Sequence, residues 1–401
     1  MLRIDVQKAR PGMKLALAVQ NPQAPSQVLL KIGFELTPQI IRRLMEYRIR
    51  HIWVRYPSLS YLERYIDADA VRSQTQVVTQ ITNTFEKLQK QSSAKLDYDE
   101  YTEALQQLVN YISTHPQSAV FLGDLADSSD DLMRHSAAVT YLSLLMGMKL
   151  EDYLVRERRH VEPGRAKEVT NLGLGAMLHD VGVTQLDPAV RRRFNQTGDE
   201  GDVQWQEHPA LGFRLVRGQV DPSAATCVLN HHQRYDGTGY AGEEYPALAE
   251  KRIHVFARIV AVADHFDRLR SPANLPPQPT VWVLNAMLTE PLHSKFDPEA
   301  LKALLAVVPP YPPGSLVRLS DGQHAVVIDH HPQDPCRPTV QIIPDPVALV
   351  EVTDPPAGPT IDLSTQQDRL SIVEHEGHDV RPFNFGPPDL AKGLTHEYAW
   401  T

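Results

Sequence analysis

Five stretches between residues 130 and 269 have the apolar periodicity of helices, and each also contains histidine or aspartate. These polar residues lie on, or at the end of, the face that the periodicity would bury. Burying an unpaired polar group costs roughly several kcal/mol, so the chain can fold in this way only if the groups acquire partners. They are His135 in 130–147, His179 and Asp180 in 169–182, His208 in 207–216, His231 and His232 in 222–232, and Asp264 in 252–269.

Each of these groups, taken alone, has an ordinary structural explanation. A core histidine can donate to a backbone carbonyl, and a buried aspartate can cap a helix or pair with an arginine. Taken together, they would leave a helical core full of polar atoms. A pair of metal ions would satisfy them, because imidazole nitrogens and carboxylate oxygens are both good metal ligands. We therefore expect a mainly α protein whose helical bundle carries a metal site.

The composition narrows the classes of function. With 42% hydrophobic and 22% charged residues, the chain has the profile of a soluble globular protein. The formal net charge of -9 argues against binding to nucleic acid polymers, which a basic surface favours. Two distant cysteines, Cys227 and Cys336, suggest neither a disulfide framework nor a CxxC metal motif. No apolar run is long enough for a membrane span or resembles a signal peptide, which predicts a cytoplasmic protein without a membrane partner.

The pattern also changes along the chain, as expected for two or three domains in 401 residues. Thr37-Pro38 predicts a helix start between strand-like runs, and Asp321-Gly322 predicts the turn of a hairpin. We read His375, Glu376 and His378 near the C-terminus as solvated residues. The expected parts are a small N-terminal α/β unit at 1–57, linking helices at 58–117, the helical domain at 118–310, a C-terminal β-rich segment with a hairpin at 311–352, and a loosely structured tail at 353–401.

The order of the polar motifs resembles a known family. A single histidine, then His-Asp, an isolated histidine, a His-His pair and a Val-Ala-Asp aspartate are similar to the HD superfamily of metal-dependent phosphohydrolases. Within it, HHQRYDGTGY followed by ARIVAVADHFDRL resembles the HD-GYP branch, whose members hydrolyse cyclic di-GMP. The resemblance covers about residues 118 to 308 and implies an HD-type helical bundle.

The resemblance implies two divalent transition-metal ions, with iron or manganese favoured and zinc or nickel as alternatives, and a bridging hydroxide that attacks the phosphodiester. Asp131 stands where some members have a glutamate for a third ion, which makes two ions the better expectation. The implied catalytic residues are His179, Asp180 and Asp264. The implied ligands are His135, His179, Asp180, His208, His231, His232 and Asp264, with Asp131 as a further candidate.

Several positions depart from the family pattern. Val183 replaces a lysine that contacts phosphate in other members, Ala241 replaces the proline of Gly-Tyr-Pro, and Gln233 replaces a glutamate after the histidine pair. The segment RSPANLPP at 270–277 replaces an Arg-Pro-Tyr-Arg motif. These changes predict that metal chemistry is kept while recognition of the nucleotide is weakened.

The sequence therefore favours metal-dependent hydrolysis of a cyclic dinucleotide of the cyclic di-GMP type. Arg234 and Tyr240, in the turn after the histidine pair, are the candidates for binding the substrate. Two alternatives stay open at this point. One is a metal-binding signalling or scaffold module that works through signalling proteins with little or no catalysis, and the other is an HD phosphohydrolase for a different nucleotide.

Overall fold

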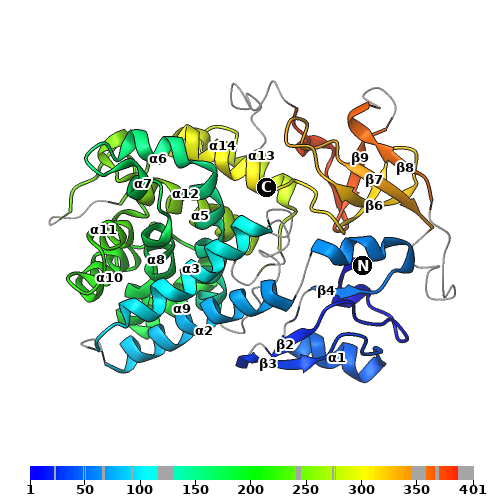
Figure 1. Cartoon of the computed structure of the whole chain (residues 1–401), viewed down its shortest axis with the longest axis horizontal. Helices are drawn as coiled ribbons and strands as arrows, with labels where there is room; N and C mark the ends of the chain where they lie inside the picture. The colour runs from blue at the N-terminus through cyan, green and yellow to red at the C-terminus, as the bar shows by residue number, and fades with distance from the viewer. Residues whose placement is uncertain are drawn as a thin grey trace.

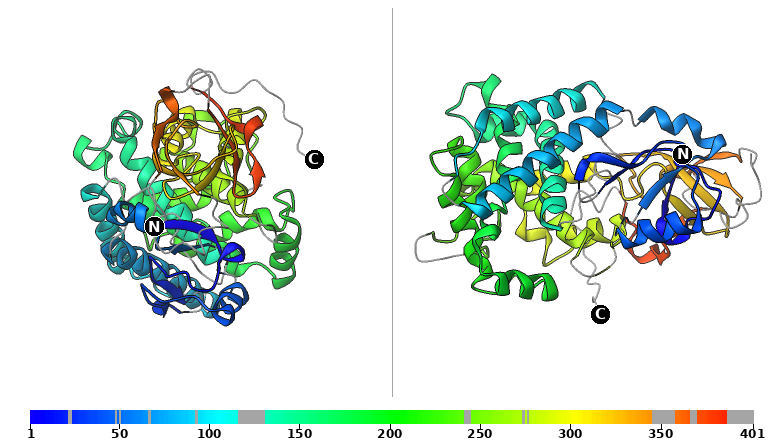
Figure 2. Two further views of the ribbon diagram at one scale, coloured as in Figure 1. Left: turned by 90° about the vertical axis from the view of Figure 1, so that its right-hand side faces the viewer. Right: turned by 90° about the horizontal axis from the view of Figure 1, so that it is seen from below.

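The structure is a computed structural model that separates into a helical part and two β-containing parts (Figure 1). The helices form one end of the molecule, and the N-terminal unit and the C-terminal sheet form the other (Figure 2). This arrangement confirms the mainly α fold class expected from the sequence. The structure describes residues 1–386 except 22–23, 48, 50, 66–67, 92–93, 116–130, 241–244, 273–274, 276, 345–357 and 366–369.

The N-terminal unit contains two short antiparallel strand pairs and one helix. The side chain of Thr37 accepts a hydrogen bond from the backbone N–H of Ile40, so the predicted helix start is confirmed. In the first strand pair, Leu2 lies opposite Val54. The elements of this unit are β1 (Leu2–Asp5), β2 (Val19–Asn21), β3 (Ala24–Leu30), α1 (Pro38–Glu46) and β4 (His51–Val54).

The helical part surrounds the segments that carry the candidate ligands. Two long helices lead into it, and most of the remaining helices begin at an aspartate, proline or threonine. The helices are α2 (Ala68–Lys90), α3 (Tyr98–Thr114), α5 (Asp131–Lys149), α6 (Glu151–Glu157), α7 (Pro163–Ala166), α8 (Thr170–Leu178), α9 (Pro188–Thr197), α10 (His208–Val216), α11 (Pro222–Asn230), α12 (Val255–Arg270), α13 (Thr280–Met287) and α14 (Pro298–Val307), with short 3₁₀ turns η3 (Val181–Gln185) and η4 (Trp205–Glu207).

Helix α8 lies at the centre of this part and packs against α3, α5, α11 and α12. A side chain on Gly175 would begin only 2.6 Å from Cβ of Cys227, so glycine lets α8 and α11 approach closely. After α8 the chain turns, and a Cβ on Gly182 would lie 2.0 Å from the backbone oxygen of His208. These close approaches bring the ends of α8, α10 and α11 together, which places their terminal histidines in one space.

The C-terminal sheet has six antiparallel strands in the order β10-β9-β5-β6-β7-β8. The predicted hairpin is present, with Gly322 at a φ of 88° in its turn. The tail, expected to be loosely structured, instead supplies three strands (β8, β9 and β10) over its described residues, whereas 353–357, 366–369 and 387–401 lie outside the described part. The strands are β5 (Leu316–Leu319), β6 (His324–Asp329), β7 (Thr339–Ile343), β8 (Thr360–Asp362), β9 (Ile372–His375) and β10 (His378–Asp379).

The strands of the tail also correct the expectation that His375 and Glu376 are solvated. His375 is only 2% exposed and its Nδ1 lies 3.3 Å from the carbonyl oxygen of Leu316. Glu376 forms ion pairs with Arg3 of β1 at 3.0 Å and Arg270 of α12 at 3.3 Å. Strand pairing between distant segments buries His375 and brings Glu376 to its two arginines, and short-range sequence pattern does not report such pairing.

The N-terminal unit and the C-terminal sheet share one hydrophobic core. Val326 of β6 and Ile343 of β7 are buried with the apolar side chains of the N-terminal unit. The backbone N–H of Arg3 donates to the carbonyl of Gly314, where a Cβ would lie 2.5 Å from the ring of Trp53. The N-terminal unit and the C-terminal sheet therefore pack as one body beside the helices. Among the described residues, every helix is too short or too polar to span a bilayer.

Candidate metal centre

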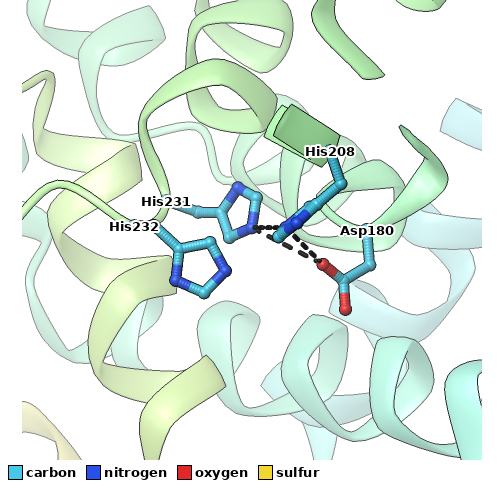
Figure 3. Close-up of side chains that lie close together, drawn as sticks. All are labelled: Asp180, His208, His231 and His232. Atoms are coloured by element: carbon cyan, nitrogen blue, oxygen red, sulfur yellow. Dashed lines mark hydrogen bonds and ion pairs between the residues drawn. The ribbon is translucent and has the colours of Figure 1, made fainter. Parts of the chain in front are cut away.

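Six of the predicted ligand residues lie together in two buried groups that share Asp180. In each group the ligand atoms all lie within 4.8 Å of one another. Figure 3 shows the first group, in which His208 and His231 point toward the carboxylate of Asp180 and His232 lies beside them. Oδ1 of Asp180 lies 3.1 Å from Nε2 of His208 and 3.6 Å from Nε2 of His231. The groups are Asp180, His208, His231 and His232, and His135, His179 and Asp180.

Three of the histidines are oriented by the backbone at the end or start of their helices. Nδ1 of His179 donates to the carbonyl of Ala176 at 2.7 Å, and the same contact joins His208 to Trp205 and His231 to Val228. A carbonyl can only accept, so Nδ1 carries the proton and the neutral ring leaves a lone pair on Nε2. Each ring is thereby held with an acceptor nitrogen facing the centre.

The centre contains acceptors that face one another without a donor between them. Nε2 of His208 lies 3.3 Å from Nε2 of His231. Both ring nitrogens of His232 and Oδ2 of Asp264 are buried without a hydrogen-bond partner among the described residues. Converging buried lone pairs of this kind are unfavourable unless a cation lies among them. These imidazole nitrogens and carboxylate oxygens therefore fit transition-metal ions as ligands. The two groups are consistent with a binuclear site.

His135 joins this centre through helix α5 and is held on both sides of its ring. Nδ1 lies 2.7 Å from Oδ2 of Asp267, and Nε2 lies 3.0 Å from Oδ1 of Asp264 and 3.2 Å from Nε2 of His179. Asp264 belongs to neither compact group, although its Oδ1 also lies 3.8 Å from Nε2 of His179. It therefore borders the second group from α12.

Burial and charge act in opposite directions on the groups of the centre. Burial, followed by the influence of His231 and His135, lowers the pKa of His179 to about 3, although the charge of Asp180 opposes this change. Burial alone would raise the pKa of Asp180, but the charges of His179 and Arg268 hold that pKa well below the usual range. The neutral imidazole and the ionised carboxylate are both the forms that bind metal.

The remaining predicted residues lie at different distances from the centre. Asp131 is exposed at the start of α5 and lies in neither group. Arg234 is buried, with Nη2 3.4 Å from Oε2 of Glu200 and Nη1 without a hydrogen-bond partner in the described part of the chain. Tyr240 stacks on His232 with ring centres 4.3 Å apart, and its buried hydroxyl has no partner among the described residues. Arg234 and Tyr240 thus offer unused donors close to the histidines.

Two of the positions that depart from the family pattern have structural partners. The side chain of Gln233 donates to the carbonyl of Tyr240 and accepts from the backbone N–H of Leu248, so it fastens the turn after the histidine pair. Val183 is 4% exposed and packs with the apolar side chains of Phe194 and Trp205. Ala241 and parts of 270–277 lie outside the described residues.

Two charged residues of α12 border the centre and were missed by the sequence analysis. Asp267 contacts His135, and the guanidinium of Arg268 contacts both Asp180 and Asp264. They lie three and four positions after Asp264, where a helix places side chains on the same face. The helical spacing was thus available in the sequence, but not the proximity of α12 to α5 and α8.

Comparison with known families agrees with this geometry. Residues 143–299 match the family described as HD domain, and residues 316–375 match the family described as KOW domain associated with HD domain. The first match begins after His135 and includes the other members of the two groups. The second contains strands β5 to β9 of the C-terminal sheet.

Several curated proteins are similar to this chain. A cyclic di-GMP phosphodiesterase of Pseudomonas aeruginosa is 31% identical over 235 residues, which cover 57% of this chain and 51% of that protein. The cyclic di-GMP phosphodiesterase response regulator RpfG of Xanthomonas campestris is 35% identical over 146 residues, or 35% of this chain and 36% of that protein. A 3'3'-cGAMP-specific phosphodiesterase of Vibrio cholerae is 29% identical over 134 residues, or 32% and 27%.

The matched region thus spans about half the length of the first of these relatives and about a third of the second. Among solved structures, an HDG"Y"P protein from Bdellovibrio bacteriovorus aligns with a TM-score of 0.45 and 19% identity, over 76% of this chain and 97% of that chain.

The helical fold and its buried His/Asp groups define residues 143–299 as an HD domain. The chain is a distant homologue of the HD-GYP cyclic di-GMP phosphodiesterases, at 31 to 35% identity to the first two relatives.

Proposed function

We propose that this chain is a metal-dependent phosphodiesterase that hydrolyses a cyclic dinucleotide. The observation that carries the proposal is the pair of buried groups joined by Asp180, in which imidazole acceptors face one another without donors. The relatives named as phosphodiesterases for cyclic di-GMP and 3'3'-cGAMP support the substrate class.

The proposed ligands are the seven residues expected from the sequence, including Asp264. When bound, two divalent ions would supply Lewis acidity and a nucleophile at neutral pH. Asp180 would hold both ions, because its Oδ1 faces one group and its Oδ2 lies 3.5 Å from Nε2 of His179 in the other. The mixed histidine and aspartate set favours iron or manganese, with zinc or nickel as further candidates.

The chain's own residues would orient the site and the substrate. Asp267 holds the ring of His135 through Nδ1 and so directs Nε2 to the centre. The buried hydroxyl of Tyr240 and Nη1 of Arg234, which have no partner among the described residues, would donate to the nucleotide. The histidines and both aspartates are nearly inaccessible, which keeps bulk water from the reacting atoms.

The test combines metal content with turnover. Protein purified without oxygen is loaded with iron or manganese, the bound metal is measured, and cyclic di-GMP and 3'3'-cGAMP are followed to their linear products. We expect about two ions per chain, with turnover abolished in His208→Ala. The exposed His160 provides the matched control, and His160→Ala should keep both metal and turnover.

Different failures point to different conclusions. Metal-loaded protein that hydrolyses neither dinucleotide would contradict the proposed substrate class. Activity on another nucleotide would favour the different-nucleotide alternative. Two bound ions without hydrolysis of any nucleotide would favour the signalling or scaffold module.

A further inference from the structure

Arg268 makes an unusual contact with both carboxylates of the candidate centre. Its Nε donates to Oδ1 of Asp264 at 2.8 Å, and its Nη2 donates to Oδ2 of Asp180 at 2.7 Å. The two aspartates come from different segments, one within α12 and one after α8. A cation is therefore built into the same carboxylate pair that the proposed metal ions would use.

Arg268 is the most accessible of the three residues in this contact. The side chain of Arg268 is 18% exposed, whereas those of Asp180 and Asp264 are 1% and 0% exposed. Its third nitrogen, Nη1, has no hydrogen-bond acceptor among the described residues and is not one of the buried unpartnered atoms. Arg268 thus holds the carboxylates with two nitrogens and leaves Nη1 without an acceptor in the described part of the chain.

The guanidinium of Arg268 also packs against two aromatic rings. Its Cζ lies 5.5 Å from the ring centre of Phe194 and 6.0 Å from that of Trp205. These rings pack with Val183, so an apolar residue at that position supports the surface on which the guanidinium rests. A planar guanidinium held in this way is preorganised to bind an oxyanion.

Resting on the proposed function, we propose that Arg268 binds a non-bridging phosphoryl oxygen of the substrate and supplies the cation that is missing at position 183. It is a substrate-binding residue on the side of the metal centre that faces Phe194 and Trp205. Nη1 reaches the phosphate while Nε and Nη2 keep Asp180 and Asp264 in place.

A purely structural role would have a different signature. If Arg268 only tied the two carboxylates together, its loss would affect metal retention and folding, but phosphate affinity at equal metal content would not change. Phosphate affinity at matched metal loading therefore separates the two roles.

The experiment uses inorganic phosphate as the probe and the full chain loaded with manganese. Calorimetry measures phosphate binding to wild type, Arg268→Gln and Arg268→Lys, with metal content determined for each. We expect Arg268→Gln to weaken phosphate binding about ten- to a hundredfold, as for loss of a charged hydrogen bond. Arg268→Lys keeps the positive charge but not the planar, forked arrangement of donors, and we expect phosphate affinity to fall roughly three- to tenfold.

Arg270→Gln is the matched control, because Arg270 lies on the same helix and pairs with Glu376 away from the centre. It should bind phosphate within about twofold of wild type, as independent sites do. Unchanged affinity in a metal-loaded Arg268→Gln protein, or no phosphate binding to wild type, would overturn the proposal. Should Arg268→Gln lose its metal or its fold, Arg268→Lys decides: wild-type affinity overturns the proposal and a loss of threefold or more supports it.

The result is distinguishable from that of the proposed function, because phosphate binding is measured without turnover. Arg268-dependent phosphate binding with no hydrolysis of a cyclic dinucleotide would contradict the proposed function alone. Hydrolysis together with Arg268-independent phosphate binding would contradict this inference alone.

Discussion

Helix α12 carries two buried ionic clusters that differ in how completely their atoms are paired. Near its start, Arg258 lies among Tyr153, Glu157 and Asp297. Near its end, Asp264 and Arg268 border the candidate metal centre. Both clusters are buried in the same helical domain, so the difference between them concerns partners rather than location.

The cluster around Arg258 is satisfied by the protein itself. Its guanidinium donates to Asp297, Tyr153 and Glu157 at 2.5 Å each, and its Nε donates to the carbonyl of Ile253 at 3.0 Å. Tyr153 in turn donates to Asp297 at 2.6 Å. None of these side-chain atoms is among the buried atoms that lack a partner. Such a network needs nothing from outside the chain.

The metal centre is the opposite case. Both nitrogens of His232, Oδ2 of Asp264 and the hydroxyl of Tyr240 are buried without a hydrogen-bond partner in the described part of the chain. Leaving several buried polar atoms unpaired costs stability, and native proteins do so mainly where a ligand completes the pairing. Buried charge alone therefore does not mark a candidate functional site; what distinguishes this one is that several unused acceptors converge on the same space.

Breaking the satisfied cluster should have the largest effect on stability. Arg258→Met leaves the buried carboxylate of Asp297 without its cation and Glu157 with only Lys251, and we expect a loss of about 3 to 5 kcal/mol in the free energy of unfolding. Urea denaturation measures it. Lys302→Met, which removes an exposed ion pair with Glu299, is the control and should change stability by less than about 1 kcal/mol. Equal effects of the two substitutions would contradict the distinction.

Removing metal should lower stability through the candidate metal centre and not through the cluster around Arg258. A chelator should lower the free energy of unfolding of metal-loaded wild type by about 2.7 kcal/mol if the ion had been present at about a hundred times its dissociation constant. Thermal melting with and without chelator measures the change. His208→Ala should melt at nearly the same temperature in both conditions, and a chelator effect that survives this substitution would place the stabilising ion elsewhere.

Adding a cation beside the centre should also be unfavourable. Val183 is 4% exposed among apolar side chains, so Val183→Lys buries an ammonium without a carboxylate partner, and we expect a loss of roughly 1 to 3 kcal/mol. Val203, which is 74% exposed, gives the control: Val203→Lys should stay within about 0.5 kcal/mol of wild type. A Val183→Lys protein as stable as the control would show that the site accepts a second cation.

Per pH unit, the smallest expected effect is a pH dependence outside both clusters. Burial, followed by the charges of Arg158 and Arg258, lowers the pKa of His254 to about 4, while the unfolded value is about 6.5. Between these values the unfolded chain binds more protons, so stability falls as pH drops from about 6.5 toward 4, by less than about 1.4 kcal/mol per pH unit.

His254→Asn should reduce this slope, because asparagine does not titrate but can still accept from the backbone N–H of Phe256 at the helix start. Denaturation of wild type and variant at several pH values measures the difference. Parallel stability curves would mean that His254 is not held neutral in the folded state.

The helical spacing of the sequence was sufficient to place most of the candidate site. His135 is on the buried face of α5, His179 and Asp180 follow α8, and His231 and His232 follow α11, as the periodicity indicated. For Asp131, the four-residue spacing predicted a place near His135 and a role as a candidate ligand. The residue is exposed in the first turn of α5 and belongs to neither group. Spacing reports the side of a helix, and exposure at a helix end depends on what packs there.

The C-terminal part shows the limit of local pattern more clearly. Strands β8, β9 and β10 come from a polar segment that the sequence predicted to be loosely structured. They form because the segment pairs with β5 and β7, in a sheet that shares a core with the N-terminal unit. Glu376 meets Arg3 across almost the whole chain. Contacts of this range are absent from any short window of sequence.

The sequence by itself therefore determined which residues would be buried as potential ligands, since helical periodicity and turn residues act over a few positions. The tertiary structure decided that Asp180 is shared between two groups, that Asp267 supports His135, and that Arg268 holds both carboxylates. The physical reason is distance along the chain: Arg268 and Asp180 are 88 residues apart, and only the packing of α12 against α8 brings their side chains within hydrogen-bonding distance.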